Sequence, residues 1–201
     1  MRQLFTIGHS TLPAEQFVRL LKQYDIDYVL DVRSTAFSKY ASQYNSDVLP
    51  HILGEAGIRY AGMGKYFGAR QAQKEYYTEE GHLDFEKFRD SELFRMGLAN
   101  VQKGLKDYNI ALMCTEKDPY DCHRAIMVSR GFELAGIDVN HILSDGSLLK
   151  QADLNERLLE QYFPERDQIS LFENENKDEQ QCLEEAYRKR NAEIGYHMTE
   201  M

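Results

Sequence analysis

The residues of this chain with the most reactive side chains lie between positions 114 and 124, where a predicted strand gives way to a predicted helix. The stretch combines thiol, carboxylate, imidazole and guanidinium groups: Cys114, Glu116, Asp118, Asp121, Cys122, His123 and Arg124. A turn from a strand to a helix needs only a glycine and a capping residue. The stretch therefore predicts a site with nucleophiles, proton carriers or metal ligands. The alternative is a tightly hydrogen-bonded loop without chemistry.

One interpretation is that this turn binds an anion. Asp121 as N-cap would place Cys122, His123 and Arg124 on the first turn of a helix that continues to about residue 135. Free backbone N–H groups and the positive end of the helix dipole gather at such a turn, and Arg124 would add a guanidinium group. The pattern predicts a bound anion such as phosphate, and the same field would lower the pKa of a nearby thiol.

The composition indicates one sizeable domain. A chain of 201 residues with 42% hydrophobic residues can bury a real core. The net charge of -9 argues against a general electrostatic coating of DNA, although it leaves room for a local basic pocket. No stretch approaches the roughly 18 apolar residues of a membrane helix, and we expect no signal peptide before the first strand. Three cysteines, two of them beside charged residues, are typical of reduced thiols, so we expect a cytoplasmic protein.

Alternating strands and helices predict a three-layer α/β fold, with a mainly parallel, twisted sheet of about five strands and helices on both faces. The expected strands lie at 4–7, 28–32, 58–61, 110–113 and 138–143. The expected helices lie at 11–24, 46–55, 84–89, 91–108, 122–135 and 148–162. We expect residues 1–163 to form a single α/β domain. Residues 164–201 are expected to form a tail, with a flexible linker to about 179 and a marginal, exposed helix at 182–194.

Polar side chains follow four of the predicted strands, at the edge where open parallel sheets bind ligands. Because chance would scatter such residues, we expect them to line one cavity. The residues with predicted catalytic roles are Glu116, Asp31, His9, Cys114 and His123. The residues with predicted roles in substrate or anion binding are Ser10, Arg33, Arg70, Cys122 and Arg124.

Several of these residues have a structural alternative. Asp31 could form an ion pair with Arg33, and His9 could bond to a backbone carbonyl. Cys114 could be a small buried hydrophobe, which is the commoner role of a buried cysteine. The glycine-rich loop at 62–70 could let backbone approach a ligand or could consist of ordinary turns.

Three segments carry a resemblance to a known family: Thr6-Ile-Gly-His-Ser10, Val29-Leu-Asp-Val-Arg33 and Cys114-Thr-Glu-Lys-Asp-Pro-Tyr-Asp-Cys-His-Arg124. They resemble the domain-of-unknown-function family 488, over about residues 4–143. The resemblance implies an enzymatic site with a Cys-x-Glu and Cys-His-Arg signature, without an agreed reaction. The chain is also similar to rhodanese-type domains, but Tyr120 stands where their loop would have arginine, so rhodanese or Cys-phosphatase chemistry is not expected.

A separate motif lies in the tail. Gln168-Ile-Ser-Leu-Phe172 resembles the peptide by which bacterial replication and repair proteins bind the sliding clamp. Leu171 and Phe172 would dock into an apolar pocket while Gln168 fixes the register. The alternative is a short apolar patch that packs back on the domain.

Three functions follow from these patterns. The first is an enzyme that cleaves a phosphoester or glycosidic bond in a phosphorylated nucleotide or nucleic acid, with a role in DNA repair or processing if the tail binds a clamp. The second is a metal or thiol redox module, in which Zn²⁺ is held by Cys114, Cys122, His123 and, if the sheet brings it within reach, His9. The seven residues between the two cysteines exceed the usual spacing of zinc ligands. The third is a non-catalytic module that binds a nucleotide.

Overall fold

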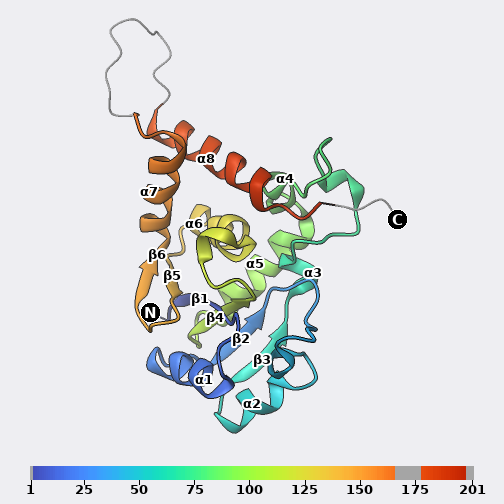
Figure 1. Cartoon of the computed structure of the whole chain (residues 1–201), viewed down its shortest axis with the longest axis vertical. Helices are drawn as coiled ribbons and strands as arrows, with labels where there is room; N and C mark the ends of the chain where they lie inside the picture. The colour runs from blue at the N-terminus through green and yellow to red at the C-terminus, as the bar shows by residue number, and fades with distance from the viewer. Residues whose placement is uncertain (1, 166–177, 198–201) are drawn as a thin grey trace, which may run out of the picture.

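A six-stranded sheet of order β3-β2-β4-β1-β5-β6 forms the centre of the computed structural model, which describes residues 2–165 and 178–197 (Figure 1). The strands are β1 (Leu4–Gly8), β2 (Tyr28–Asp31), β3 (Arg59–Gly62), β4 (Ile110–Cys114), β5 (Val139–Ile142) and β6 (Leu148–Lys150). The first five pair in parallel, and β6 runs antiparallel to β5. The predicted α/β class and mainly parallel sheet are confirmed.

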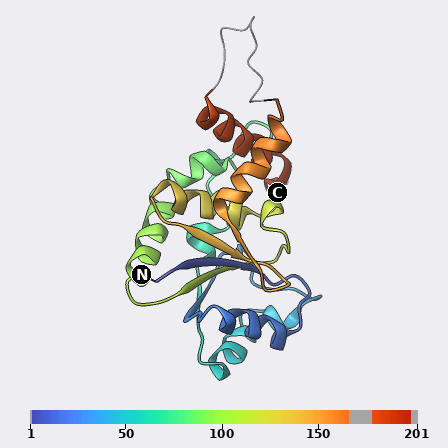
Figure 2. The same cartoon turned by 90° about the vertical axis from the view of Figure 1, so that its left-hand side faces the viewer.

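Helices cover both faces of this sheet. Figure 2 shows α1 (Ala14–Gln23) and α2 (Leu49–Glu55) below it and the other long helices above it. The upper helices are α3 (Gly64–Phe67), α4 (Phe85–Arg89), α5 (Glu92–Gly104), α6 (Arg130–Leu134), α7 (Gln151–Tyr162) and α8 (Glu179–Ile194). The short turns are η1 (Ser42–Tyr44), η2 (Lys74–Tyr76), η3 (Pro119–Asp121) and the π-helical η4 (Arg124–Ser129).

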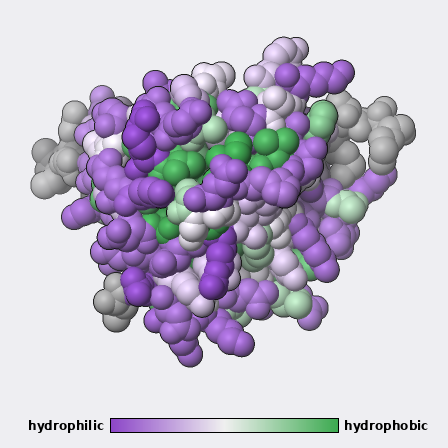
Figure 3. Space-filling view, turned by 90° about the horizontal axis from the view of Figure 1, so that it is seen from below, coloured by the Kyte–Doolittle hydropathy of each residue, from purple (hydrophilic) through white to green (hydrophobic). Residues whose placement is uncertain are grey.

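Two hydrophobic cores result, because successive side chains of a strand point to opposite faces. Phe5 and Ile7 of β1 pack toward α1 and α2, whereas Leu4 packs toward the larger upper core. Seen from the end where α1 and α2 lie, the outer surface is mainly hydrophilic and crossed by an apolar band (Figure 3). None of the helices among the described residues is both long and apolar enough to cross a bilayer.

The end of the sheet differs from the sequence prediction. Leu148–Lys150 forms β6, whereas the sequence predicts that a helix begins at Leu148. A tight hairpin causes this difference: Gly146 adopts φ 87°, and the N–H of Leu143 donates to the carbonyl of Ser147 at 2.9 Å. Three residues are too few for a periodicity to separate strand from helix.

The helix after β4 also differs, because Asp121 does not cap it. Cys122 is extended, with φ -135° and ψ 135°, and its carbonyl accepts the first helical bonds from Ala125 and Ile126. The Sγ atom of Cys122 accepts a hydrogen bond from the N–H of Arg124 at 3.4 Å. The predicted N-cap is therefore wrong, and a thiol caps the turn instead.

The C-terminal helix α8 is packed rather than exposed. Cys182, Leu183, Ala186 and Tyr187 are buried in the upper core, and α8 lies beside α7 (Figure 1). The prediction of an exposed helix is wrong because these side chains share one face of the helix, at the spacing of an amphipathic stripe. The predicted clamp-binding residues Gln168, Leu171 and Phe172 lie outside the described residues.

Candidate metal centre

Four side chains at the carboxyl end of β4 converge on one point. The Sγ atoms of Cys114 and Cys122 each lie 3.0 Å from Oε2 of Glu116. Nδ1 of His123 lies 3.7 Å from the sulfur of Cys114 and 4.0 Å from that of Cys122. The four potential ligand atoms all lie within 4.8 Å of one another. The structure thus brings together four of the residues that the sequence predicts for the site.

Chain geometry explains how two cysteines separated by seven intervening residues meet. Cys114 ends β4, and η3 turns the chain back so that Cys122 returns to the same point before η4 begins. Asp118 starts η3, and its carboxylate accepts a hydrogen bond from the N–H of Tyr120 at 2.9 Å. Pro119 then follows at the first position of the turn, where its fixed φ is favourable. The loop itself brings both thiols to one side of the sheet.

Arg124 stabilises the loop between Cys114 and Cys122 through hydrogen bonds from its buried guanidinium group. Its guanidinium group is fully buried and donates to the carbonyls of Glu116 at 2.7 Å and Lys117 at 3.2 Å. Nε donates to the hydroxyl of Thr6 at 3.3 Å, which ties the loop to β1. The sequence predicts that Arg124 binds an anion, whereas the structure directs its donors into the protein's own loop. We assign Arg124 a positioning role.

Gly8, at the end of β1, allows the loop that contains Glu116 to pack closely against this strand. A Cβ atom at Gly8 would lie 1.9 Å from the carbonyl oxygen of Glu116 and 3.0 Å from the guanidinium of Arg124. Real contacts of this kind do not occur, so only glycine lets β1 and the loop approach so closely. The N–H of His9 then donates to the carbonyl of Cys114 at 2.9 Å.

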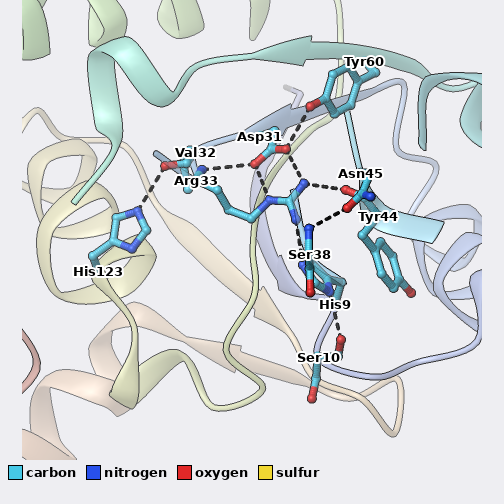
Figure 4. A network of polar contacts seen from close by, with 10 residues as sticks. All are labelled: His9, Ser10, Asp31, Val32, Arg33, Ser38, Tyr44, Asn45, Tyr60 and His123. Carbon is cyan, nitrogen blue, oxygen red and sulfur yellow. Dashed lines mark hydrogen bonds and ion pairs between the residues drawn. The ribbon is translucent and has the colours of Figure 1, made fainter. Parts of the chain in front are cut away.

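His123 is oriented by the backbone of the neighbouring strand. Nε2 lies 3.2 Å from the carbonyl oxygen of Val32 and donates to it, which leaves Nδ1 free to accept (Figure 4). Metal-binding histidines commonly donate their second N–H to a carbonyl in this way, which fixes the tautomer and the ring orientation. The lone pair of Nδ1 therefore faces the two thiols.

The charges of the cluster are strongly coupled. Burial, together with the neighbouring Cys122, raises the pKa of Cys114 and of Glu116. Burial opposes ionisation of Cys122, but the hydrogen bond with Cys114 and the positive charge of Arg124 lower the pKa of this thiol. Burial also opposes the charged form of His123, whose pKa is nevertheless raised by its contact with Cys122. A cation at the centre would relieve this crowding of groups that become negative.

The donor set fits Zn²⁺. Thiolate sulfur and imidazole nitrogen are the ligands that Zn²⁺ prefers, and carboxylate oxygen also binds it. A tetrahedral site with zinc bonds of about 2.0–2.3 Å has edges of about 3.3–3.8 Å, close to the separations of 3.0–4.0 Å found here. Cys114 and Cys122 are buried, whereas Glu116 is exposed. The carboxylate of Glu116 points to the two thiols, while the rest of this residue is exposed.

A second network lies at the end of β2, around a buried ion pair (Figure 4). Asp31 accepts from Nε of Arg33 at 2.8 Å and from Nη2 at 2.6 Å, and the hydroxyl of Tyr60 donates to the same carboxylate at 2.8 Å. Arg33 also donates to the carbonyl of Tyr44 at 2.6 Å. Both charged side chains are almost completely inaccessible. Of the two alternatives from the sequence, the structure has the ion pair.

His9 belongs to this second network. Its Nδ1 donates to the carbonyl of Ser10 at 2.9 Å, and its Nε2 accepts from Arg33 at 3.1 Å. The ring stacks on Tyr44 with centroids 4.1 Å apart. Burial, with a further contribution from Arg33, lowers the pKa of His9 to about 4. Among the described residues Glu116, rather than His9, completes the candidate metal set.

The sheet separates the two networks. Asp31 and Tyr44 lie on the α1 and α2 side, while Cys114 and Cys122 belong to the upper core. The backbone of Val32 connects them, because its carbonyl accepts from His123. The sequence predicts one shared cavity at the sheet edge. The structure instead has two adjacent clusters, because side chains at alternate positions of a strand point to opposite faces.

Ser10 and Arg70, also predicted to bind substrate, lie outside the four-residue cluster. Ser10 adopts φ 44°, and its N–H donates to the carbonyl of Thr115 at 2.8 Å. Arg70 is exposed, and its guanidinium lies 4.1 Å from the ring centroid of Tyr196. Neither residue contributes a ligand atom to the cluster.

The sequence patterns do not predict which residues hold the loop between the two cysteines in place. The ring of Tyr120 lies between the guanidinium groups of Arg157 at 3.9 Å and Arg190 at 4.3 Å. Arg190 also donates to the carbonyl of Tyr120 at 3.1 Å and pairs with Asp121, while Arg157 pairs with Asp118. No local pattern marks an arginine of α8 as a partner of a loop about 70 residues earlier.

Comparison with known proteins gives one match. A protein-family model described as "Domain of unknown function DUF488" matches residues 13–130, which is more than half of the chain and includes all four residues of the cluster. No curated protein and no solved structure matches the chain.

Proposed function

The chain belongs to the DUF488 family, whose description names no reaction, and from the site itself we propose that it is a zinc-dependent enzyme, a hydrolase or a transferase. Cys114, Cys122 and His123 hold the ion, and Glu116 is the fourth ligand or the proton carrier beside it. The proposal rests on a single observation: four groups suited to zinc meet at the carboxyl end of a parallel sheet.

A catalytic role is favoured over a purely structural one by the unequal exposure of the four groups. Catalytic zinc sites commonly keep three protein ligands and an open fourth position, whereas structural sites are closed. Here two thiols are buried and Glu116 is exposed. Bound zinc would supply Lewis acid chemistry. Glu116, whose pKa is raised by burial and by Cys122, would hold or release a proton beside the ion.

For the substrate we propose a phosphorylated compound, as the sequence predicts. Lys117 is exposed and follows Glu116 directly, so its ammonium group would attract an anion to the open side of the cluster. Nucleotides and single-stranded DNA are the first compounds to screen.

The first test is the zinc content of the purified protein by mass spectrometry. We expect about one zinc ion per chain, lost in Cys122→Ser and retained in the matched control Cys182→Ser. Cys182 is also buried but lies in α8, outside the cluster. Absence of zinc, together with failure of the protein to take up added zinc, would overturn the proposal.

The second test separates catalysis from structure. Glu116→Gln should keep zinc through the remaining three ligands but lose at least about 100-fold in turnover of a substrate found in the screen. A zinc-loaded variant with unchanged turnover would remove the role of Glu116.

A thiol redox module is a second candidate, because Cys122 has a lowered and Cys114 a raised pKa beside it. Peroxide would convert the two thiols to a disulfide, with two electrons and two protons passing to form water. Mass spectrometry after peroxide treatment tests it: the disulfide between these two cysteines supports the candidate, and unchanged free thiols in the zinc-free protein exclude it.

A further inference from the structure

We propose that Arg89, Arg130 and Arg188 form a binding site for a small oxyanion of phosphate or sulfate size. The site lies between α4, α6 and α8, away from the candidate metal centre. It would hold either free phosphate or the phosphate group of a larger ligand.

A cavity of about 110 Å³ separates these helices, and all three arginines line it. Since roughly 10–15 Å³ of such volume is enough to hold one water, the cavity has room for several water-sized groups. Four oxygens around one central atom fill a comparable space. The cavity therefore has room for a tetrahedral oxyanion.

Arg89 experiences the negative charges of Glu86 and Asp90 but forms no ion pair with either. Among residues 2–165 and 178–197, its guanidinium group has no hydrogen bond and no ion pair. Burial, followed by the positive charge of Arg130, lowers the pKa of Arg89. Two guanidinium groups brought together in a partly buried cavity are unfavourable unless an anion joins them.

Two nearby carboxylates pair with the other arginines of the site rather than with Arg89. Glu86 binds Arg188 through both oxygens, at 2.7 and 3.2 Å. Glu133 binds Arg130 at 2.7 Å and accepts from Asn155 at 2.6 Å. Glu184, the second carboxylate in the lining, accepts from Gln180 at 3.1 Å. None of these carboxylates hydrogen-bonds to Arg89.

The surrounding contacts hold the arginines in place. The guanidinium of Arg130 lies 4.7 Å from the ring centroid of Tyr187, and its partner Glu133 fixes it from the other side. Gly131 places its backbone against Arg89, whose Cδ would lie 3.4 Å from a Cβ added there. Arginine forks held in this way can donate several bonds to one oxyanion.

The experiment is a calorimetric titration of the full chain with inorganic phosphate and with sulfate, at constant ionic strength set with chloride. We expect saturable binding of one anion per chain, and at least a tenfold higher Kd in Arg89→Met. Arg95→Met is the matched control, because Arg95 is an exposed arginine whose partner Asp90 is exposed as well. The control should bind phosphate like the unchanged protein.

Two further arms complete the design. If Arg89→Met fails to fold, Arg89→Lys and Arg188→Met replace it, and each should still weaken binding. Phenyl phosphate distinguishes the two sources of the anion: tighter binding than inorganic phosphate indicates the phosphate group of a larger ligand. Absence of saturable binding, or equal Kd values in the Arg89 and Arg95 variants, would overturn the site. Zinc content is unaffected by either result, so the two proposals stand or fall separately.

Discussion

The Nε2 atom of His123 donates to the carbonyl oxygen of Val32 at 3.2 Å, so the backbone directly after β2 sets the direction in which this imidazole offers its other nitrogen. Val32 stands between Asp31 and Arg33, whose side chains form the buried ion pair on the opposite face. The end of β2 thereby supports both clusters, one through a backbone carbonyl and one through side chains.

The tautomer of His123 follows from this bond. With zinc bound, we expect Nε2 of His123 to carry the proton and Nδ1 to bind the metal. Nitrogen-15 NMR of the imidazole side chains measures this directly. A proton on Nδ1 in the zinc-loaded protein would contradict the arrangement.

The contacts of Arg190 with the loop between Cys114 and Cys122 should increase the affinity for zinc. Arg190→Ala removes the contacts with Tyr120 and Asp121, so we expect a loss of about tenfold in zinc affinity, as for other groups that orient metal ligands. Competition with a chelator dye measures it. The control is Arg188→Ala on the same helix, which removes an exposed pair with Glu86 and one arginine of the proposed anion site but no hydrogen bond to the loop. Equal affinities in both variants would show that α8 does not position the loop.

The buried ion pair of Asp31 and Arg33 should contribute strongly to the free energy of unfolding. Asp31→Asn leaves Arg33 buried without its full partner, and we expect a loss of about 3–5 kcal/mol in the free energy of unfolding. The exposed pair of Arg95 and Asp90 gives the matched control, and Asp90→Asn should cost less than about 1 kcal/mol. Urea denaturation of both variants is the measurement. Similar losses would show that burial does not set the strength of the pair.

Gly8 should resist substitution. Gly8→Ala would push the carbonyl of Glu116 away, because the added Cβ would lie 1.9 Å from it. We expect a loss of several kcal/mol in stability together with weaker zinc binding. Gly54→Ala in α2 is the control, since nothing lies within 4 Å of a Cβ there, and it should be neutral or stabilising by about 0.5–1 kcal/mol. Thermal denaturation compares the two, and a tolerated Gly8→Ala would argue against the close approach.

His141 should make the protein acid-sensitive. Its ring lies between the hydroxyl of Thr6 and Oε1 of Gln151, each at 2.8 Å, and burial with Arg124 lowers its pKa from 6.5 to about 3. Between these two values the unfolded chain binds a proton that the folded chain does not, so stability falls as pH falls. From pH 6.5 to 4.5 this amounts to about 2 kcal/mol.

Urea denaturation at the two pH values tests this effect of His141. His141→Gln should remove its share, so the loss of stability between pH 6.5 and 4.5 should be smaller in the variant. An equal loss in both proteins would assign the acid sensitivity to other groups.

The sequence by itself determined most elements of the fold and showed that several reactive residues share one loop. Strand and helix periodicities are local, so they located β1 to β5 and the long helices without knowledge of their partners. The pairing of Cys114 with Glu116 and of Cys122 with His123 within one loop is local as well. These features could be predicted because neighbouring residues determine them.

Only the tertiary structure decided which of these side chains meet. The alternation of side chains along β2 places Asp31 on the face of the sheet opposite Cys114. Asp31 is buried on that face and forms an ion pair with Arg33. The contact between Arg190 in α8 and Tyr120 depends on packing between segments that are far apart in the chain. Such contacts arise from burial of apolar surface around the whole sheet, which no local pattern of residues records.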